Sequence, residues 1–253
     1  MIFDSHAHYD DEQFDIDRTE LLGSVLPSKG VEGIIDMSSS YESIEKVMKL
    51  TEDYPNIYGA VGIHPENAKN LPEGWLEYVE NCASNKKIIA IGEIGLDYYW
   101  EDACPRDIQK DVFIAQVELA NRLNLPISVH DRDAHGDTFD ILRKYRPRGV
   151  VHCFSGSVEL AREIVKLGMY IGVGGVVTFK NARHSVDVVR DIPLDRLLLE
   201  TDCPYLSPVP MRGKRNDSSN IAYTATKVAE IKGISITEVL ESSRENIRTL
   251  FGI

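Results

Sequence analysis

Histidines and acidic residues recur in this chain at positions suited to holding a metal ion. The sequence begins MIFDSHAHYD, so that Asp4, His6 and His8 stand at alternating positions. In a strand, alternating side chains lie on the same face, and these three would therefore lie together. Imidazole nitrogens and carboxylate oxygens are donors for Zn, Mn, Fe, Co and Ni, and for Mg where water completes the shell. The segment predicts part of a metal centre.

Four later apolar segments end in residues of the same kind. Glu93 closes IIAIGE, His130 closes PISVH, His152 lies near the end of GVVHCF, and Asp202 follows RLLLET. A lone buried histidine is usually a hydrogen-bonded core residue, but burying all these groups together without a cation would be costly. We therefore predict that one metal centre contains the six residues His6, His8, Glu93, His130, His152 and Asp202.

The size of this donor set favours two ions. Six ligands are too many for one tetrahedral ion and suit two ions that share a carboxylate. Two ions about 3.5–4 Å apart can activate a water and stabilise the leaving oxygen of a phosphoryl displacement. Glu93, from the middle of the set, is the expected bridge. Asp4 is expected to orient a ligating histidine or to pack in the barrel floor, and Cys153 and Cys203 are expected to be packing residues.

Eight short apolar stretches alternate with longer amphipathic segments and would position these side chains. Such alternation indicates a parallel sheet covered by helices, and eight units in 253 residues predict an α/β fold of the (β/α)8 TIM-barrel type. In a barrel the carboxyl ends of all strands meet at one face, where active sites are built. The predicted strands are Ile2–His8, Val31–Met37, Ile57–Gly62, Ile88–Gly92, Pro126–His130, Gly149–Phe154, Met169–Val173 and Arg196–Thr201.

Helices are predicted between the strands and at the C-terminal end. Two C-terminal helices within Ile221–Phe251, divided at Gly233 and with Ser235 or Thr237 as the second N-cap, would complete the outer layer. The other predicted helices include Asp17–Pro27, Tyr41–Asp53, Pro105–Leu123 and Val158–Leu167. An open doubly wound sheet is the competing fold, but the Gly-rich phosphate loop expected after an early strand is absent from the sequence. With no linker-like run, residues 1–253 are expected to form a single domain.

Composition narrows the class of protein. A net charge of −12 argues against a protein that coats nucleic acid, yet an enzyme can still hold a few phosphates, because divalent metals supply positive charge. The sequence has neither a long apolar run nor a signal-like start, so we expect no membrane partner. Four scattered cysteines without a CxxC pair favour reduced thiols in the cytoplasm.

Seven motifs in the chain, taken together and in order, resemble the TatD family of metal-dependent deoxyribonucleases. They are DSHAH, GIHPE, IGEIGLDYY, SVHDRDA, HCFSG, IGVGG and ETDCPYLSPVPMRGKRN, and the resemblance runs from Ile2 to about Phe251. The resemblance implies a (β/α)8 barrel and two divalent ions, Mg, Mn or Zn. It also implies a DNase, often a 3′→5′ exonuclease, whose substrate would be single-stranded DNA or 3′ ends.

The resemblance also implies roles for individual residues. His6, His8 and Asp202 would bind one ion, His130 and His152 the other, and Glu93 would bridge them. As catalytic residues, Asp202 would orient the attacking water or take its proton, and Glu200 would support the site or assist proton transfer. His64, in GIHP, would contact the substrate phosphate.

A basic loop and an aromatic segment are further candidates for substrate contact. Arg212, Lys214 and Arg215 are expected at the rim of the metal face, where they would hold a phosphate backbone. Met211 stands where the family commonly has histidine, and Asp217–Ser218 where it has Glu-Pro, so the contacts of this loop are less closely implied. Tyr98, Tyr99 and Trp100 follow the fourth strand and could stack on bases or cover the barrel top, and Arg132 could face the site.

Two other hypotheses stay open. An amidohydrolase-like enzyme would use the same site on another ester or an amide, including an ester on tRNA. Several such enzymes bridge their metals with a modified lysine at the end of strand four, where this chain has Glu93, which favours the nuclease. A barrel kept as a binding scaffold is disfavoured by the complete ligand set. A monomer is the expected oligomeric state.

Overall fold

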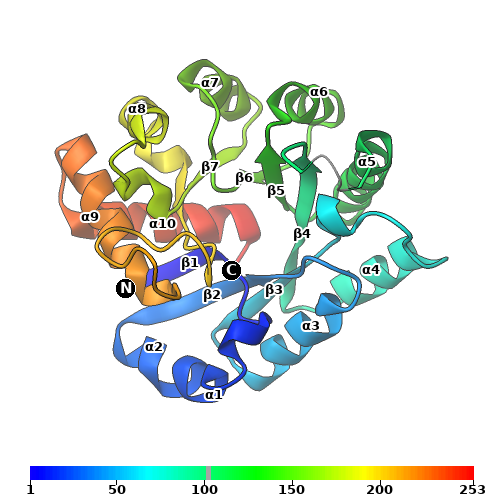
Figure 1. The fold of residues 1–253 in the computed structure, drawn as a ribbon, viewed down its shortest axis with the longest axis horizontal. Coiled ribbons are helices and arrows are strands. Elements are labelled where there is room, and N and C mark those ends of the chain that lie inside the picture. Colours follow the sequence, from blue (N-terminus) through cyan, green and yellow to red (C-terminus); the bar gives the residue numbers. More distant parts are fainter. Residues whose placement is uncertain (101–103) are drawn as a thin grey trace.

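A parallel β-sheet is the centre of the molecule. The computed structural model describes residues 1–100 and 104–253, and within them eight strands follow one another in chain order around the sheet. An isolated parallel bridge between Ala7 and Cys203 joins the last strand region to the first, so the sheet curls into a nearly closed barrel (Figure 1). The predicted (β/α)8 barrel is confirmed. The strands are β1 (Ile2–Ala7), β2 (Val31–Met37), β3 (Ile57–Val61), β4 (Ile88–Asp97), β5 (Ile127–Arg132), β6 (Gly149–Val151), β7 (Tyr170–Val173) and β8 (Leu197–Leu199).

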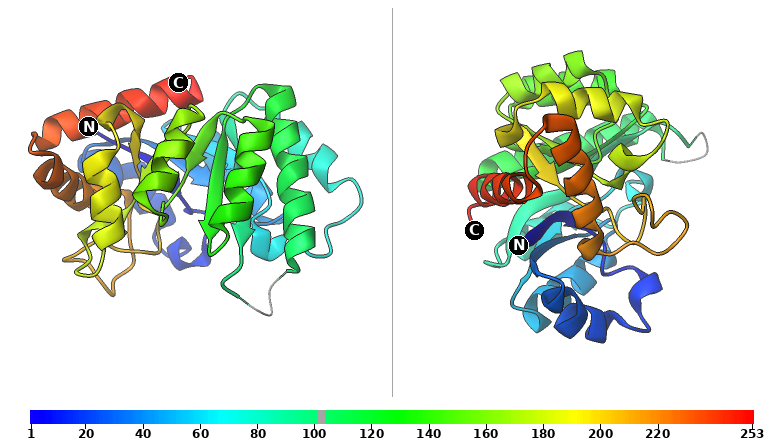
Figure 2. Two further views of the ribbon diagram at one scale, coloured as in Figure 1. Left: turned by 90° about the horizontal axis from the view of Figure 1, so that it is seen from above. Right: turned by 90° about the vertical axis from the view of Figure 1, so that its left-hand side faces the viewer.

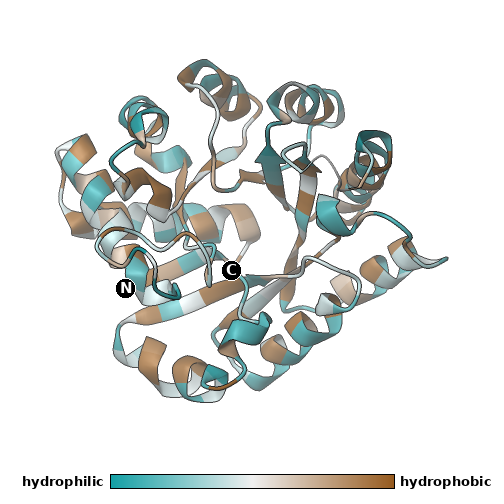
Figure 3. Cartoon of the chain, in the orientation of Figure 1, coloured by the Kyte–Doolittle hydropathy of each residue, from teal (hydrophilic) through white to brown (hydrophobic). Residues whose placement is uncertain are grey.

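Helices surround the barrel with their apolar faces inward. In α3, for example, Ile44, Val47 and Leu50 are buried at helical spacing, and the colouring of Figure 3 shows the same division on the other outer helices. In the described parts of the chain, no helix is both long and apolar enough to cross a membrane. The helices are α1 (Arg18–Glu20), α2 (Leu26–Ser28), α3 (Ser43–Asp53), α4 (Trp75–Ala83), α5 (Arg106–Leu123), α6 (His135–Tyr145), α7 (Val158–Lys166), α8 (Arg183–Asp191), α9 (Ile221–Lys232) and α10 (Ile236–Phe251).

The C-terminal helix α10 closes one end of the barrel. Gly233 ends α9 in a left-handed conformation, and Ser235 starts α10 with a capping box that it forms with Glu238. Three apolar side chains of α10, from Ile247, Leu250 and Phe251, are buried against the inward-facing residues of the strands. Figure 2 shows α10 lying across this end of the barrel. The carboxyl ends of the strands are therefore left as the open face.

The fourth strand differs from its predicted bounds. We expected it to end at Gly92, but β4 continues to Asp97, and all ten of its residues are buried. The extension forms because Ile94 and Gly95 pair with Val129 and His130 of β5 after a register shift. Glu93 consequently lies inside a strand rather than at its end. Strands β6 and β8 are shorter than predicted, and the site residues that follow them lie on the first turns of loops.

The helix predicted over Asp17–Pro27 forms without interruption from Arg18 to Ser28, but its middle is a π-helical turn. A π-helical turn over Leu21–Val25 separates two short α-helical pieces, α1 and α2. Gly23 lies in the middle of that turn, and glycine lowers helix stability because it costs more backbone entropy than other residues. The sequence pattern predicts one continuous amphipathic helix but does not predict its π-helical turn.

Gly95 offers a test of the β4–β5 pairing. Its φ is 150°, and a Cβ added there would lie 1.9 Å from the carbonyl oxygen of His130, which is backbone and cannot yield without opening the sheet. We expect Gly95→Ala to lower the free energy of unfolding by about 3 kcal/mol or more, and the Tm by roughly 6–12 °C. Thermal unfolding followed by circular dichroism measures this.

Gly136 is the matched control. A Cβ at this position in α6 meets no heavy atom within 4 Å. Gly136→Ala should leave the Tm unchanged or raise it slightly, since alanine favours a helix. Equal Tm values for the two variants would contradict the pairing described here.

Candidate metal centre and active site

The six predicted ligands converge at the open end of the barrel. His6 and His130 lie on β1 and β5, and Glu93 lies within β4. His8 directly follows β1 and His152 directly follows β6, whereas Asp202 is separated from β8 by Glu200 and Thr201. All but His6 line a cavity of about 470 Å³, and His6 is fully buried beneath it.

The seam between β1 and the segment after β8 places Asp202 beside the two N-terminal histidines. The His8 amide donates to the Cys203 carbonyl at 2.8 Å, and the Asp202 amide donates to the His6 carbonyl at 3.0 Å. Asp202 itself has φ 58°, in the left-handed region that aspartate tolerates better than most residues. These contacts close the barrel and assemble one side of the site at the same time.

Glu93 lies between two groups of imidazoles. Its Oε2 is 3.5 Å from His6 Nε2 and 3.4 Å from His8 Nε2. Its Oε1 is 2.9 Å from His130 Nδ1 and 2.7 Å from His152 Nε2. Asp202 Oδ1 joins the first group, at 3.7 Å and 3.4 Å from His6 and His8 Nε2. Each oxygen of the Glu93 carboxylate thus faces a different set of nitrogens.

The spacing in the first group fits a shared cation better than direct hydrogen bonds. His6 Nε2 and His8 Nε2 are 3.2 Å apart, and most of their distances to carboxylate oxygens are too long for good hydrogen bonds. Donors bonded to one ion at about 2.0–2.2 Å are separated by about 3.0–3.5 Å. Within residues 1–100 and 104–253, the donor sets whose ligand atoms all lie within 4.8 Å of one another are His6–His152–Asp202, His6–His8–Glu93 and His64–Glu93–His130.

The ring nitrogens that face away from the site have partners that fix each ring. His6 Nδ1 is 3.1 Å from Ser128 Oγ, and His8 Nδ1 is 2.9 Å from the Met37 carbonyl. His130 Nε2 is 3.0 Å from Asp97 Oδ2. Such partners orient a metal-binding imidazole and set its basicity.

Sequence reasoning missed Asp97 and Ser128. Asp97 stands four residues after Glu93 and Ser128 two before His130, so each shares a strand face with a predicted ligand. The alternation would have identified Asp97 if β4 had been extended past Gly92. Asp97 is 1% exposed, and its carboxylate is held by His130 and by the Tyr99 amide.

His64 and Glu200 lie next to the second group. His64 begins a short 3-10 helix (Pro65–Asn67), where its Nδ1 accepts from the Glu66 amide, and its Nε2 is 3.7 Å from Glu93 Oε1. Glu200 is fully buried behind His152, with Oε1 3.8 Å from His152 Nδ1. Glu200 Oε2 and His152 Nδ1 have no hydrogen-bond partner among the described residues.

Asp4 is fully buried and bonds to backbone amides and hydroxyls rather than to an imidazole. It accepts from the Thr201 and Ser218 hydroxyls, both at 2.6 Å, and from the Thr201 and His6 amides at 3.0 Å and 3.3 Å. Ser218 is one of the two residues that depart from the family pattern, and its hydroxyl supplies one of these bonds. Asp4 therefore ties β1 to the loops that follow β8.

Burial and neighbouring charges set the protonation of the site. Burial, and after it the charge of His152, lowers the pKa of His6 to about 4, and burial with His130 lowers the pKa of His64 to about 3. Burial raises the pKa of Glu93, but His152, His64 and His6 outweigh it and hold that pKa well below its usual range. His6 and His64 are therefore neutral beside an ionised Glu93, and neutral imidazole and ionised carboxylate are the forms that bind cations.

Four other groups, His8, His130, His152 and Glu200, have a raised pKa that favours the protonated form. Burial lowers the pKa of His130, but its bonds to Asp97 and Glu93 dominate and raise it to about 10. Burial raises the pKa of Glu200 to about 8, and His152 and the Cys153 amide only partly offset that effect. In the metal-free protein at neutral pH, His130 would therefore be an imidazolium, with protons on both ring nitrogens, one facing Asp97 and one facing Glu93.

The cations of the PMRGKR loop lie outside this cavity. Arg215 forms two hydrogen bonds with Asp17, at 2.8 Å and 2.5 Å, and its guanidinium lies over the Phe14 ring. Arg212 lies over the Phe179 ring at 3.9 Å, and with Lys214 it lines a separate, shallower depression. The structure thus brings the predicted metal ligands and His64 together, but not these three residues.

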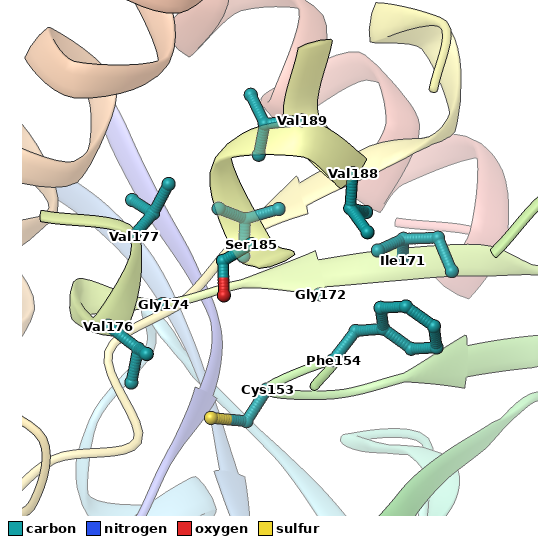
Figure 4. A pocket seen from close by; sticks show the side chains of 11 residues that line it. Cys153, Phe154, Ile171, Gly172, Gly174, Val176, Val177, Ser185, Val188 and Val189 are labelled. Atoms are coloured by element: carbon teal, nitrogen blue, oxygen red, sulfur yellow. The ribbon is translucent and has the colours of Figure 1, made fainter. Parts of the chain in front are cut away.

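A second, much smaller recess is too small and too apolar for chemistry. It lies beside Cys153 and Phe154, and Val176, Val177 and Val188 help to line it (Figure 4). Its volume of about 20 Å³ holds about one water, and none of its lining residues carries a charged side chain. The large cavity above Glu93 is therefore the candidate active site.

Comparison with known proteins agrees with this site. Residues 3–252 match the model of the family described as TatD related DNase. The chain belongs to the TatD family. It is 44% identical over 256 residues to the metal-dependent hydrolase YabD of Bacillus subtilis, covering all of both chains. It is 35% identical to the metal-dependent hydrolase YcfH of Escherichia coli K12, covering all of this chain and 96% of the relative.

A solved structure of a TatD homologue has the same fold. The crystal structure of YjjV from Escherichia coli K12 superposes with a TM-score of 0.93 at 32% identity, covering 100% of this chain and 98% of that one. This TatD-family protein is therefore a metal-dependent hydrolase built on a TIM barrel, and its His, Glu and Asp groups are suited to binding metal.

The Asp97–His130 pair makes metal binding by this TatD protein depend on pH. The ion must displace the extra proton of His130, and those of His8 and His152, so apparent affinity should rise as pH increases from 6 to 9, and binding at pH 7 should release protons. Asp97→Asn removes the bond that raises the pKa of His130, so fewer protons should be released. Calorimetry of Zn binding in two buffers of different ionisation enthalpy measures the number of protons released per ion bound.

The control is Asp140→Asn, which changes an exposed carboxylate on α6 that pairs with Arg143. It should release as many protons as the wild type. Unchanged proton release in Asp97→Asn would show that this carboxylate does not govern His130.

Proposed function

We propose that this TatD-family protein is a deoxyribonuclease that removes nucleotides from the 3′ end of single-stranded DNA with two divalent ions. The position of Glu93, with one oxygen toward each group of donors, carries the proposal. His6, His8 and Asp202 would hold one ion, His130 and His152 the other, and Glu93 both. Mg, Mn and Zn all accept these donors.

Ions held there would supply charge that neutralises the phosphate and lowers the pKa of a bound water. Asp202 is the carboxylate that substrate can reach, since its side chain is 16% exposed, against 5% for Glu93 and none for Glu200. Its Oδ1 faces His6 and His8, which leaves Oδ2 to orient the attacking water and take its proton. We therefore assign Asp202 as the general base.

Glu200 would act on this chemistry through His152. Its carboxyl group lies behind the imidazole, out of reach of substrate, and it accepts a hydrogen bond from the Cys153 amide. A group with a pKa raised to about 8 by burial can hold a proton near neutral pH and share it with His152 Nδ1. Glu200 would thereby keep His152 Nε2 directed at Glu93.

The shape of the cavity supports attack on a strand end. A volume of about 470 Å³ falls in the range of pockets that enclose one ligand of small-molecule size, which suits a terminal nucleotide. His64, on the wall beside the second group, would contact the phosphate. Arg212 and Lys214 lie further out and would hold the backbone of a longer strand, whereas Arg215 could join them only if its pair with Asp17 opened.

We further propose that residues 1–253 work as one domain and as a monomer, because the barrel supplies every member of the donor set from one chain. The four cysteines are free thiols, which supports a reducing compartment such as the cytoplasm.

A labelled-end assay tests the function. Purified protein with Mg, Mn or Zn should release mononucleotides from 3′-labelled single-stranded DNA, faster than from a blunt duplex. Glu93→Gln keeps the shape of the side chain but removes the charge shared by both donor groups. Its kcat/KM should fall more than about 100-fold, since even groups that only support ligands cost 10–100-fold.

Glu77→Gln, an exposed change on α4, serves as the matched control and should retain full activity. Equal activity of Glu93→Gln and wild type would indicate a contaminating nuclease. Hydrolysis of amides or carboxylic esters, with no action on DNA, would favour the amidohydrolase alternative.

A further inference from the structure

One side of the cavity mouth carries two exposed aromatic rings. Tyr99 and Trp100, which follow β4 directly, are 50% and 53% exposed, and Trp100 lines the same cavity as the metal ligands. Exposure of large aromatic rings to water is unfavourable. A ligand that covers these rings would therefore gain free energy from removing apolar area from water. Two adjacent exposed rings at the entrance to a candidate active site point to an aromatic ligand.

Arg132 completes this surface, which we call the aromatic rim (Tyr99, Trp100 and Arg132). The Arg132 guanidinium carbon lies 3.7 Å from the centre of the Tyr99 ring and 5.5 Å from that of Trp100. The two rings meet edge to face, with centres 4.7 Å apart. The main chain fixes the arrangement, because the Tyr98 amide donates to the Arg132 carbonyl at 2.9 Å.

The rim also supplies positive charge where the cavity otherwise has little. Arg132 lines the cavity, and no carboxylate of the described residues lies within salt-bridge distance of its guanidinium. A guanidinium stacked on a ring uses its face there and keeps its N–H edges for a planar oxyanion. Asp10, Asp11 and Glu66 line other parts of the cavity wall, so the anionic part of a ligand would be drawn toward Arg132.

We propose that the aromatic rim binds the nucleotide next to the scissile phosphate, with its base stacked on Trp100 and its phosphate held by Arg132. The proposal rests on the proposed nuclease function and specifies the substrate. Base stacking on aromatic side chains tolerates any sequence, because every base has a π-face. Bases inside a duplex have both faces covered, so the rim selects unpaired strand ends.

Kinetics on two substrates test the stacking. One is a single-stranded oligonucleotide, and the other is the same strand with abasic residues at its last two 3′ positions. Trp100→Ala should lower kcat/KM on the normal strand by about tenfold to a hundredfold, mainly through KM. On the abasic strand it should change kcat/KM less than twofold. Trp100→Phe keeps a ring and should restore most of the activity.

Two further variants separate the parts of the rim from unrelated surface changes. Arg132→Gln should lower kcat/KM on both substrates, because its contact is with phosphate. Tyr223→Ala removes a 39% exposed ring on α9, away from the cavity, and should leave both values unchanged.

A binding measurement tests the aromatic rim without requiring catalytic turnover. Addition of dAMP to the metal-loaded protein should quench tryptophan fluorescence, whereas 2-deoxyribose 5-phosphate should not. The chain has two tryptophans, and Trp100→Phe, which leaves Trp75 as the reporter, should abolish the quench.

The outcomes separate the two proposals. Quenching by dAMP in a protein without nuclease activity would support the rim and reject the DNase function. Nuclease activity that Trp100→Ala lowers equally on both strands, or equal responses to dAMP and the sugar phosphate, would overturn the rim and leave the DNase function standing.

Discussion

The contact between the Glu93 carboxylate and the imidazoles on both of its sides is the interaction on which the site depends. An ionised carboxylate that is 5% exposed would be strongly destabilising in an apolar barrel. Here His6 and His8 face one oxygen, and His130 and His152 face the other. The same contacts that make burial of the charge tolerable place His, Glu and Asp donors where we propose that two cations bind.

The fold supports this contact from several directions. The irregular register of β4 between Ile91 and Ile94 sets Glu93 inside the barrel, and the continuation of the strand brings Asp97 behind His130. The seam at Ala7 and Cys203 brings Asp202 to the opposite side. Helix α10 fills the other end with apolar side chains, so the polar end is the one that substrate can enter. The contacts that close the barrel are therefore also the contacts that bring the site residues together.

Much of this arrangement could be predicted from the sequence, because it follows from the two-residue period of a strand and from the position of the polar residues at strand ends. Alternation in DSHAH puts two histidines on one face of a strand. The regular succession of strands and helices predicts a parallel barrel, in which the carboxyl ends of the strands meet at one face. The length of β4 could not be predicted, because it depends on pairing with β5 after a register shift. The placement of Arg215 could not be predicted either, since its partner Asp17 lies 198 positions away in the sequence. A run of cations in a loop gives local charge but not the direction of each side chain.

The central claim is that Glu93 separates two ion sites in one barrel. The most direct test is a crystal structure of the protein loaded with Mn or Zn, with anomalous data collected at the absorption edge of the metal. The account predicts two anomalous peaks, one bonded to His6, His8 and Asp202 and the other to His130 and His152, each within bonding distance of a different Glu93 oxygen. A single peak, or two peaks that do not share Glu93, would contradict it.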